Sequence, residues 1–203
     1  MQAETYYHIY HHANGVENLF CSSENYRYFL RQWIKYIEPV ADSYAYCLMP
    51  NHFHFLIRTL DEAQVLKFLK SKDPTLQGFE TLGGFSNVMS RQFSHLFNSY
   101  SQAFNKMYNR RGSLFISNFK QKEIANDAYL TTIIMYIHRN PIHHHFRKCF
   151  DDWPHSSYPS ILSNKTSRLR KREVLDWFGG KEAFEDFHTS QLNLADHSLF
   201  IDY

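Results

Sequence analysis

The sequence predicts an α+β protein of the split β-α-β, ferredoxin-like type, in which an antiparallel sheet carries helices and a small helical appendage follows. Short β-prone runs and amphipathic helical segments follow one another in the order strand, helix, strand, strand, helix, strand, helix. The chain has 203 residues, 43% of them hydrophobic, which is enough to bury one sizeable core. These observations exclude a disordered chain.

The first strand and the first helix are separated by a turn. Residues Thr5 to His11 are aromatic and β-prone, and Asn14-Gly15 supplies the turn. Ser22 and Ser23 can cap a helix that Pro39 stops. The apolar residues of this helix recur at helical spacing: Tyr26, Phe29, Leu30, Trp33, Ile34 and Ile37.

A hairpin comes next. The run Ser43 to Met49 is predicted to be a strand, and Pro50-Asn51 forms the turn into a second strand, His52 to Arg58. Adjacent strands joined by so short a turn pair as a hairpin. We expect the second of them to be central in the sheet.

The second half begins with a short helix from Asp61 and continues with the longest helix of the chain, between Ser86 and Tyr108. Its apolar residues form one stripe about six turns long. The run Leu114 to Ile124 is predicted to be a strand interrupted by Ser117-Asn118.

The last helix of this region begins after a cap at Asn126 or Asp127 and covers Ala128 to Arg139. It should end before Pro141, because the residue that precedes a proline avoids the helical region. After about residue 162 the composition changes. We predict a main domain over 1–162, followed by a basic linker and a helical appendage over 163–203.

Charge and cysteine content limit the partners and the compartment. The net charge is only +2, but two local basic groups occur. They are Lys106, Arg110, Arg111, Lys120 and Lys122, and Lys165, Arg168, Arg170, Lys171 and Arg172. The cysteines number three and are widely spaced, which argues against a disulfide framework. With no apolar leader at the first residues, we expect a cytoplasmic protein without a membrane partner.

The most informative pair of residues is His52 and His54 at the start of the second hairpin strand. Side chains alternate along a strand, so both imidazoles point to the same face. Burying two such groups requires hydrogen bonds or a cation to satisfy the ring nitrogens. Two hydrogen-bonded core histidines are the plainer explanation of this pair taken alone.

The helix before Pro141 contains the second informative pair. Tyr136 and Asn140 are four residues apart and therefore lie on one helix face. A cation can polarise a phosphodiester oxygen, and a phenolate can attack the phosphorus to form a covalent phosphotyrosine. A histidine pair together with a tyrosine therefore suits cleavage of a phosphodiester.

These segments resemble the two motifs of the single-tyrosine HUH transposases: Met49 to Ile57, which contains the histidine pair, and Tyr136 to Pro141. Three further segments resemble the branch called REP-associated tyrosine transposases. They are Arg110 to Phe115, Asn118-Phe119-Lys120 and Trp153-Pro154-His155-Ser156-Ser157-Tyr158. The similarity extends from about Thr5 to Leu162.

The resemblance implies that His52 and His54 are metal ligands, that Tyr136 is the nucleophile and that Asn140 is a third ligand. Two imidazoles and an amide oxygen suit Mg²⁺ or Mn²⁺ more than a structural Zn²⁺. The resemblance also implies that the protein cleaves and joins single-stranded DNA at hairpin-bearing, REP-like sequences through a 5′-phosphotyrosine. The expected form is a nucleoid-associated monomer or homodimer.

Arg110, Arg111, Lys120 and Lys122 are the candidate DNA contacts. The sequence departs from the family pattern at three places: His11 to Gly15 after the first strand, the residues near Asn118, and Ile142 followed by His143 to His145 after Asn140-Pro141. DNA contacts of these loops are therefore not predicted.

One alternative function stays open, and two other interpretations are set aside. A hairpin-binding protein of the same descent without turnover is the second function, although the presence of all four residues of the site favours the enzyme. A nucleotide hydrolase with a histidine triad needs a further histidine at alternate spacing, where Leu56 stands. His138 should face away from Tyr136, and a surface histidine cluster explains it and the triple histidine better than metal binding does.

Overall fold

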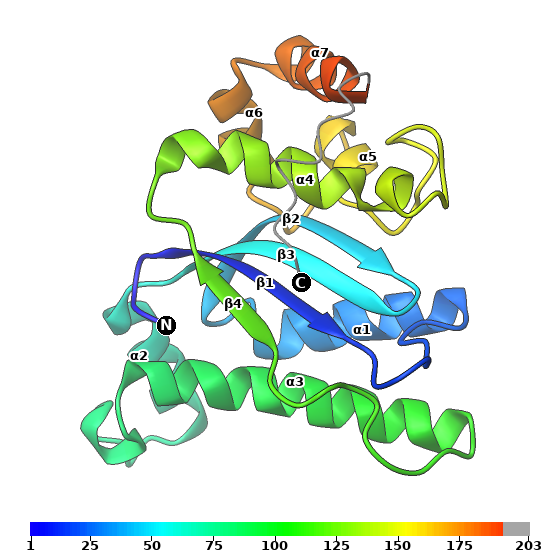
Figure 1. Ribbon diagram of the computed structural model, residues 1–203. Helices are drawn as coiled ribbons and strands as arrows, with labels where there is room; N and C mark the ends of the chain where they lie inside the picture. Colours follow the sequence, from blue (N-terminus) through cyan, green and yellow to red (C-terminus); the bar gives the residue numbers. More distant parts are fainter. Residues whose placement is uncertain (193–203) are drawn as a thin grey trace.

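The middle layer of the protein is a four-stranded antiparallel sheet, seen in a computed structural model that describes residues 1–192 (Figure 1). The strands are β1 (Tyr6–His12), β2 (Ala41–Met49), β3 (His52–Thr59) and β4 (Lys120–Glu123), in the spatial order β2-β3-β1-β4. Since β3 lies between β1 and β2, the unit β1-α1-β2 is split. The predicted fold class, the hairpin and the central place of the histidine strand are confirmed.

Helices cover both faces of the sheet. The helices α1 (Ser23–Tyr36) and α3 (Phe85–Met107) lie on one face, and α4 (Leu130–His143) lies on the other (Figure 1). The remaining helices are α2 (Glu62–Lys72), α5 (Tyr158–Leu162), α6 (Lys171–Phe178) and α7 (Lys181–Leu192), with short 3₁₀ turns at Glu80–Leu82 and Asp127–Tyr129. No helix of the described chain is long and apolar enough to cross a membrane.

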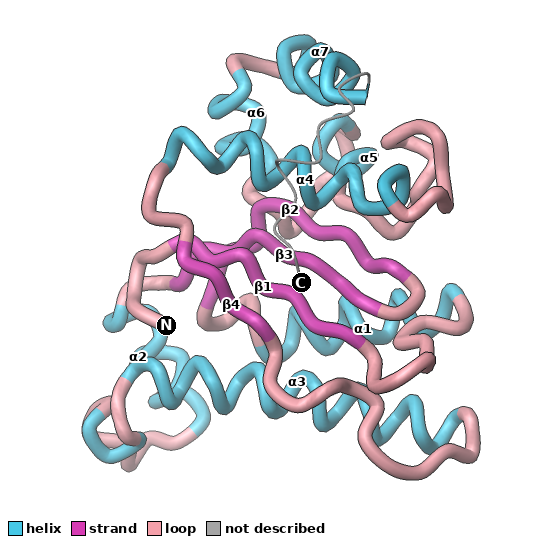
Figure 2. Tube along the Cα trace, viewed as in Figure 1, coloured by secondary structure: helices cyan, strands magenta, loops and turns pink. Residues whose placement is uncertain are grey.

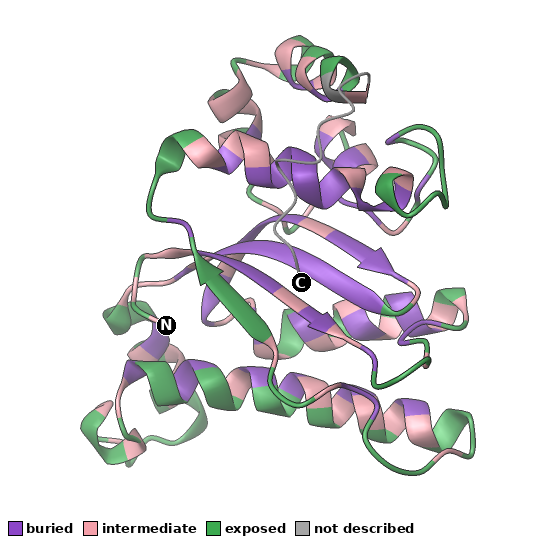
Figure 3. Cartoon of the chain, viewed as in Figure 1, coloured by how far each residue is buried: buried purple, intermediate pink, exposed green. Residues whose placement is uncertain are grey.

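Alternation along β3 divides the core in two. Phe53, Phe55 and Ile57 pack toward α1 and α3, whereas Leu56 packs with the apolar residues of α4. The stacked rings of Phe55 and Trp33, with centroids 3.6 Å apart, join the sheet to α1. Figure 3 shows β3 almost entirely buried and β4 exposed, as expected for a central and an edge strand.

The strand predicted over Leu114 to Ile124 is shorter in the structure, where it begins only at Lys120. Asn118 has a left-handed backbone (φ 62°), which an extended strand cannot contain. Before this residue a single bridge joins Phe115 to Ala13. The segment 112–119 therefore runs beside the end of β1 as a loop.

The prediction that the tyrosine helix ends before Pro141 is wrong, since α4 continues to His143 with the proline inside it. A proline lacks the N–H that would bond the carbonyl of Ile137. The side-chain amide of Asn140 donates to that carbonyl (3.4 Å) and to the carbonyl of Tyr136 (3.0 Å). The asparagine thus compensates for the missing bond.

The predicted helical appendage is confirmed as α6 and α7, which lie on the side of α4 remote from the sheet (Figure 2). Val174 and Phe184 are fully buried and belong to the same apolar cluster as α4. The appendage therefore shares a core with the tyrosine helix. The division of the chain after residue 162 stays a prediction, and its last part, 193–203, lies outside the described residues.

Candidate metal and tyrosine site

The face of the sheet beneath α4 is rich in histidine. Residues directly opposite each other in antiparallel strands share a face, and β1 pairs with β3 so that His12 is opposite His52 and Tyr10 is opposite His54. His8 lies on the same face of β1, two residues before Tyr10. The predicted histidine pair therefore stands beside two further histidines and a tyrosine from β1.

His52 is fixed by two amides. Its Nδ1 is 2.8 Å from Oδ1 of Asn51, and its Nε2 is 3.4 Å from Oδ1 of Asn140. The amide oxygen of Asn51 can only accept, so Nδ1 carries the hydrogen and donates. In a neutral imidazole the lone pair then lies on Nε2 and faces Asn140.

Asn140 also directs a lone pair into this space. Because its amide nitrogen donates to carbonyls of α4, its oxygen is the atom that faces His52. Burial lowers the pKa of His52 to about 3, so the ring is neutral near pH 7. Two acceptors that face each other repel unless a cation lies between them. The donor set therefore fits a divalent metal ion.

His54 is oriented by a histidine that sequence reasoning missed. Its Nδ1 lies 2.9 Å from Nε2 of His8, and both rings are buried. When Nδ1 of His54 donates, the lone pair lies on Nε2, the nitrogen that a metal would use. The alternation His8, Tyr10, His12 in the first strand was the available signal.

This contact gives a prediction about metal affinity. Changing His8 to phenylalanine removes the acceptor but keeps a flat ring in the same space. We expect Mn²⁺ affinity, measured by electron paramagnetic resonance titration, to fall about 10- to 100-fold, as is typical when a group that orients a metal ligand is lost. His8→Gln, which restores an acceptor, should recover part of the affinity. Unchanged affinity in both variants would remove His8 from the site.

Tyr136 lies against the histidine pair from the helix side. Its ring meets His54 and His8 edge-on, with centroids 5.6 and 5.7 Å apart. The side chain is 6% exposed. A second tyrosine, Tyr10, also lies on this face, and its ring centroid is 5.8 Å from that of His54. One chain thus brings two phenols, of which only Tyr136 was predicted, next to the histidines.

No third histidine, cysteine or carboxylate side chain of residues 1–192 converges with His52 and His54. Within residues 1–192, the group of three histidine, cysteine or carboxylate side chains whose ligand atoms converge is the exposed set Cys149, Asp151 and Asp152. An exposed acidic set of this kind is common without an ion. The amide oxygen of Asn140 lies 3.4 Å from His52 and could complete a mixed nitrogen and oxygen site with the histidine pair.

The four predicted DNA contacts differ in their surroundings. Lys120 and Lys122 are exposed on β4, opposite Tyr10 and His8, and so share the histidine face. Arg111 is exposed. Arg110 is held by Glu17 (3.1 Å) and by contacts within its own loop, so it fixes this loop. Their role in DNA binding stays a prediction.

The other histidines divide into two groups. His143, His144 and His145 are exposed at the end of α4, as predicted, although the ring of His144 comes within 5.0 Å of that of His52. His138 faces away from the site as predicted, but it does not lie on the surface. It contacts Ser157 (2.7 Å) and His188 (3.0 Å), so it joins α4 to α7.

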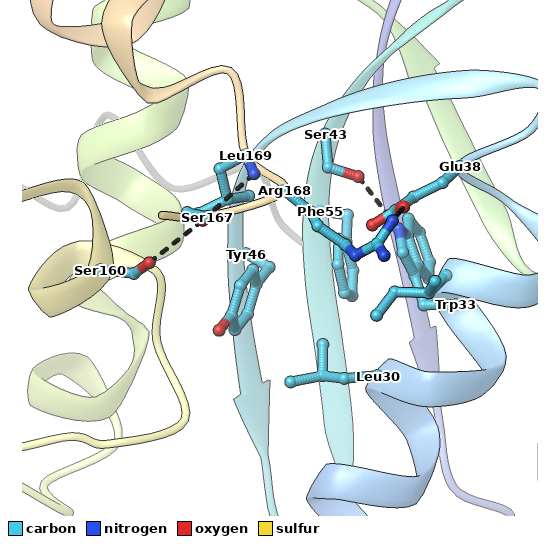
Figure 4. A pocket seen from close by; sticks show the side chains of 11 residues that line it. Leu30, Trp33, Glu38, Ser43, Tyr46, Phe55, Ser160, Ser167, Arg168 and Leu169 are labelled. Carbon is cyan, nitrogen blue, oxygen red and sulfur yellow. Dashed lines mark hydrogen bonds and ion pairs between the residues drawn. The ribbon is translucent and has the colours of Figure 1, made fainter. Parts of the chain in front are cut away.

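A cavity of about 180 Å³ lies elsewhere, between α1, β2 and the loop before α6 (Figure 4). Arg168 pairs with Glu38 (2.9 Å) beside the rings of Trp33 and Phe55. Trp33 donates to Ser43 (3.0 Å). These polar groups are already satisfied, so the cavity adds no chemistry to the histidine site.

Three comparisons place this chain among known proteins. No protein-family model and no curated protein sequence matches it. Its structure is similar to that of a REP-associated tyrosine transposase bound to a REP hairpin, with a TM-score of 0.59. The likeness covers 80% of this chain and 82% of the other, at 15% sequence identity. It confirms the fold, and it does so with a member of the family that the sequence motifs resemble.

Proposed function

We propose that the protein is a metal-dependent enzyme that nicks and joins single-stranded DNA at hairpin-bearing sequences, of the REP-associated tyrosine transposase type. The observation that carries this proposal is the pair of facing acceptors, Nε2 of His52 and Oδ1 of Asn140, with the Tyr136 ring beside His54. The motif resemblance and the likeness in fold support it independently.

The chemistry assigned to each group follows from its type. A divalent ion at His52, His54 and Asn140 would polarise a non-bridging phosphate oxygen. The phenol of Tyr136 loses its proton and its oxygen forms a bond to phosphorus while the bond from phosphorus to the 3′ oxygen breaks, and that oxygen leaves as a 3′-hydroxyl after taking up one proton, so the proton count balances. Attack by another 3′-hydroxyl reverses the reaction and joins strands. The phosphotyrosine retains the energy of the broken bond, so no nucleotide cofactor is required.

The direct test uses a hairpin oligonucleotide with unpaired flanks and a label on the strand that follows the cleavage point. Incubation with Mg²⁺ or Mn²⁺ should yield a labelled protein band on a denaturing gel, and EDTA should prevent it. A protein that binds the hairpin tightly but never forms this band with either ion would support the second function, binding without turnover.

Replacement of His52 by alanine separates chemistry from binding. Loss of one ligand should lower the cleavage rate about 10³-fold, because metal stabilisation of the reacting phosphate contributes several kcal/mol. Hairpin affinity should stay within about threefold, since it depends on many phosphate contacts. Gel shift and single-turnover cleavage measure the two quantities. Equal losses in both would indicate that the metal is structural.

A further inference from the structure

A polar groove lies beneath β1, on the face opposite the histidine site. It runs between α3 and the segment 112–119 and has a volume of about 540 Å³. His11 lines this groove, while its neighbour His12 faces the catalytic side of the sheet. The backbone N–H of Ile116 donates to the carbonyl of His12 (3.1 Å), so the groove wall is attached to the end of β1 beside the site.

One wall of the groove carries neutral hydrogen-bonding side chains. Ser94, Asn98 and Gln102 follow one another at intervals of four residues on α3, and all three are exposed. Asn118 lines the groove from the facing segment. Within the described chain, the amides of Asn98, Gln102 and Asn118 make no hydrogen bond. Each therefore offers a donor and an acceptor to a ligand.

The floor of the groove is aromatic. Phe97 and Phe119 are partly exposed there, with ring centroids 5.5 Å apart. His11 stacks on Phe115 at 4.8 Å and is 3% exposed. Its buried Nδ1 has no hydrogen-bond partner within the described residues. A buried ring nitrogen without a partner is costly, so this position is not explained by packing within the described residues.

The lining distinguishes between classes of ligand. It contains no lysine, arginine, aspartate or glutamate, so it offers no charged partner to a phosphate or to a cationic group. Aromatic faces with neutral amides suit a flat, neutral group that stacks and has donors and acceptors on its edge. Nucleobases have these properties: every base stacks on an aromatic ring, and Asn and Gln read base edges.

We propose that this groove binds unpaired nucleobases of the DNA strand whose phosphate reaches the histidine site. The inference rests on the proposed function and names the part of the substrate that the groove would select. Lys120 and Lys122 lie on the edge strand between the two places, where a DNA backbone would pass from one face to the other. The groove then specifies bases near the cleavage point, while the lysines hold the phosphates.

The test is a binding experiment that needs no cleavage. The full chain carrying Tyr136→Phe is titrated in EDTA with two hairpins, one blunt and one with unpaired flanks. In the flanked hairpin, 2-aminopurine replaces one unpaired base at a time. Stacking on Phe97 or Phe119 should quench fluorescence at one or two positions and leave the others bright.

The double variant Asn98→Ala, Gln102→Ala should weaken binding of the flanked hairpin about tenfold or more, given what one well-held base contributes. Binding of the blunt hairpin should change less than about twofold. Gln92→Ala, an amide of α3 that lies outside the groove, serves as the matched control and should behave like the parent.

Affinity of the double variant for the flanked hairpin equal to that of the parent, or no position-specific quenching, would overturn the groove while leaving the nicking activity intact. Phe119→Leu provides a second variant that keeps an apolar floor but removes one of the two stacking rings, and it should reduce the quenching at one position or more. Failure of the parent chain to bind either hairpin would instead refute the proposed function itself.

Discussion

Replacing Tyr136 by phenylalanine should abolish the covalent adduct between protein and DNA, with at least a 10⁴-fold loss of cleavage. Phenylalanine keeps the ring that packs edge-on against His54 and His8, so the fold and the proposed metal ligands should be unaffected. Only the attacking oxygen is lost, so the protein can form no bond to the phosphorus. Single-turnover cleavage and a denaturing gel measure the loss.

The matched control is Tyr10→Phe, because Tyr10 is the other phenol of the histidine face and its ring is nearly as close to that of His54. We expect this variant to retain adduct formation within about threefold. Tyr136 lies on the same face of α4 as Asn140, whereas Tyr10 lies on strand β1. If Tyr10→Phe eliminates the adduct and Tyr136→Phe does not, the assignment of the nucleophile is wrong.

Acid should unfold the protein at a mildly low pH. His8, His11, His138 and His188 are buried, and burial lowers the pKa of His8 to about 3, that of His11 to about 4 and that of His188 to about 4. The pKa of His138 is lowered well below its ordinary value. The unfolded chain therefore binds more protons than the native chain between about pH 4 and pH 6.5.

The sign follows from this difference. The stability that the neutral histidines provide is complete above pH 6.5 and is lost as the pH falls toward 4. At pH 5 the lowered pKa values of His8, His11 and His188 each correspond to a loss of about 2 kcal/mol in the free energy of unfolding. Three such losses, about 6 kcal/mol in all, reach the range of the whole stability of a typical domain. Urea unfolding followed by circular dichroism at pH 8, 6 and 5 checks the prediction.

The variant His11→Phe measures how much one of these histidines contributes to the pH dependence of stability. His11→Phe places a ring in an environment that already contains Phe53, Phe97 and Phe115. It should raise the free energy of unfolding at pH 5 by about 2 kcal/mol more than at pH 8. A variant whose stability changes equally at both pH values would show that His11 does not take up a proton on unfolding.

Much of the fold was predictable because local signals and tertiary packing agree. The alternation of β3 and the apolar stripe of α3 each place one face against a layer of the structure, and the turn at Pro50-Asn51 fixes the hairpin. Two predictions failed because of one local side-chain bond and one local backbone conformation. Pro141 lies inside α4 because Asn140 bonds the carbonyl that the proline leaves open, and the strand before Lys120 is shortened by Asn118.

By itself the sequence determined most of the elements and placed His52 with His54, and Tyr136 with Asn140, on one face of their elements, because strand alternation and a four-residue helix spacing are local properties. Only the tertiary structure decided that Tyr136 and Asn140 lie over His52 and His54, and that His8 from another strand orients His54. The reason is that pairing register and helix docking depend on which surfaces bury each other, and such contacts join residues that are distant in the chain.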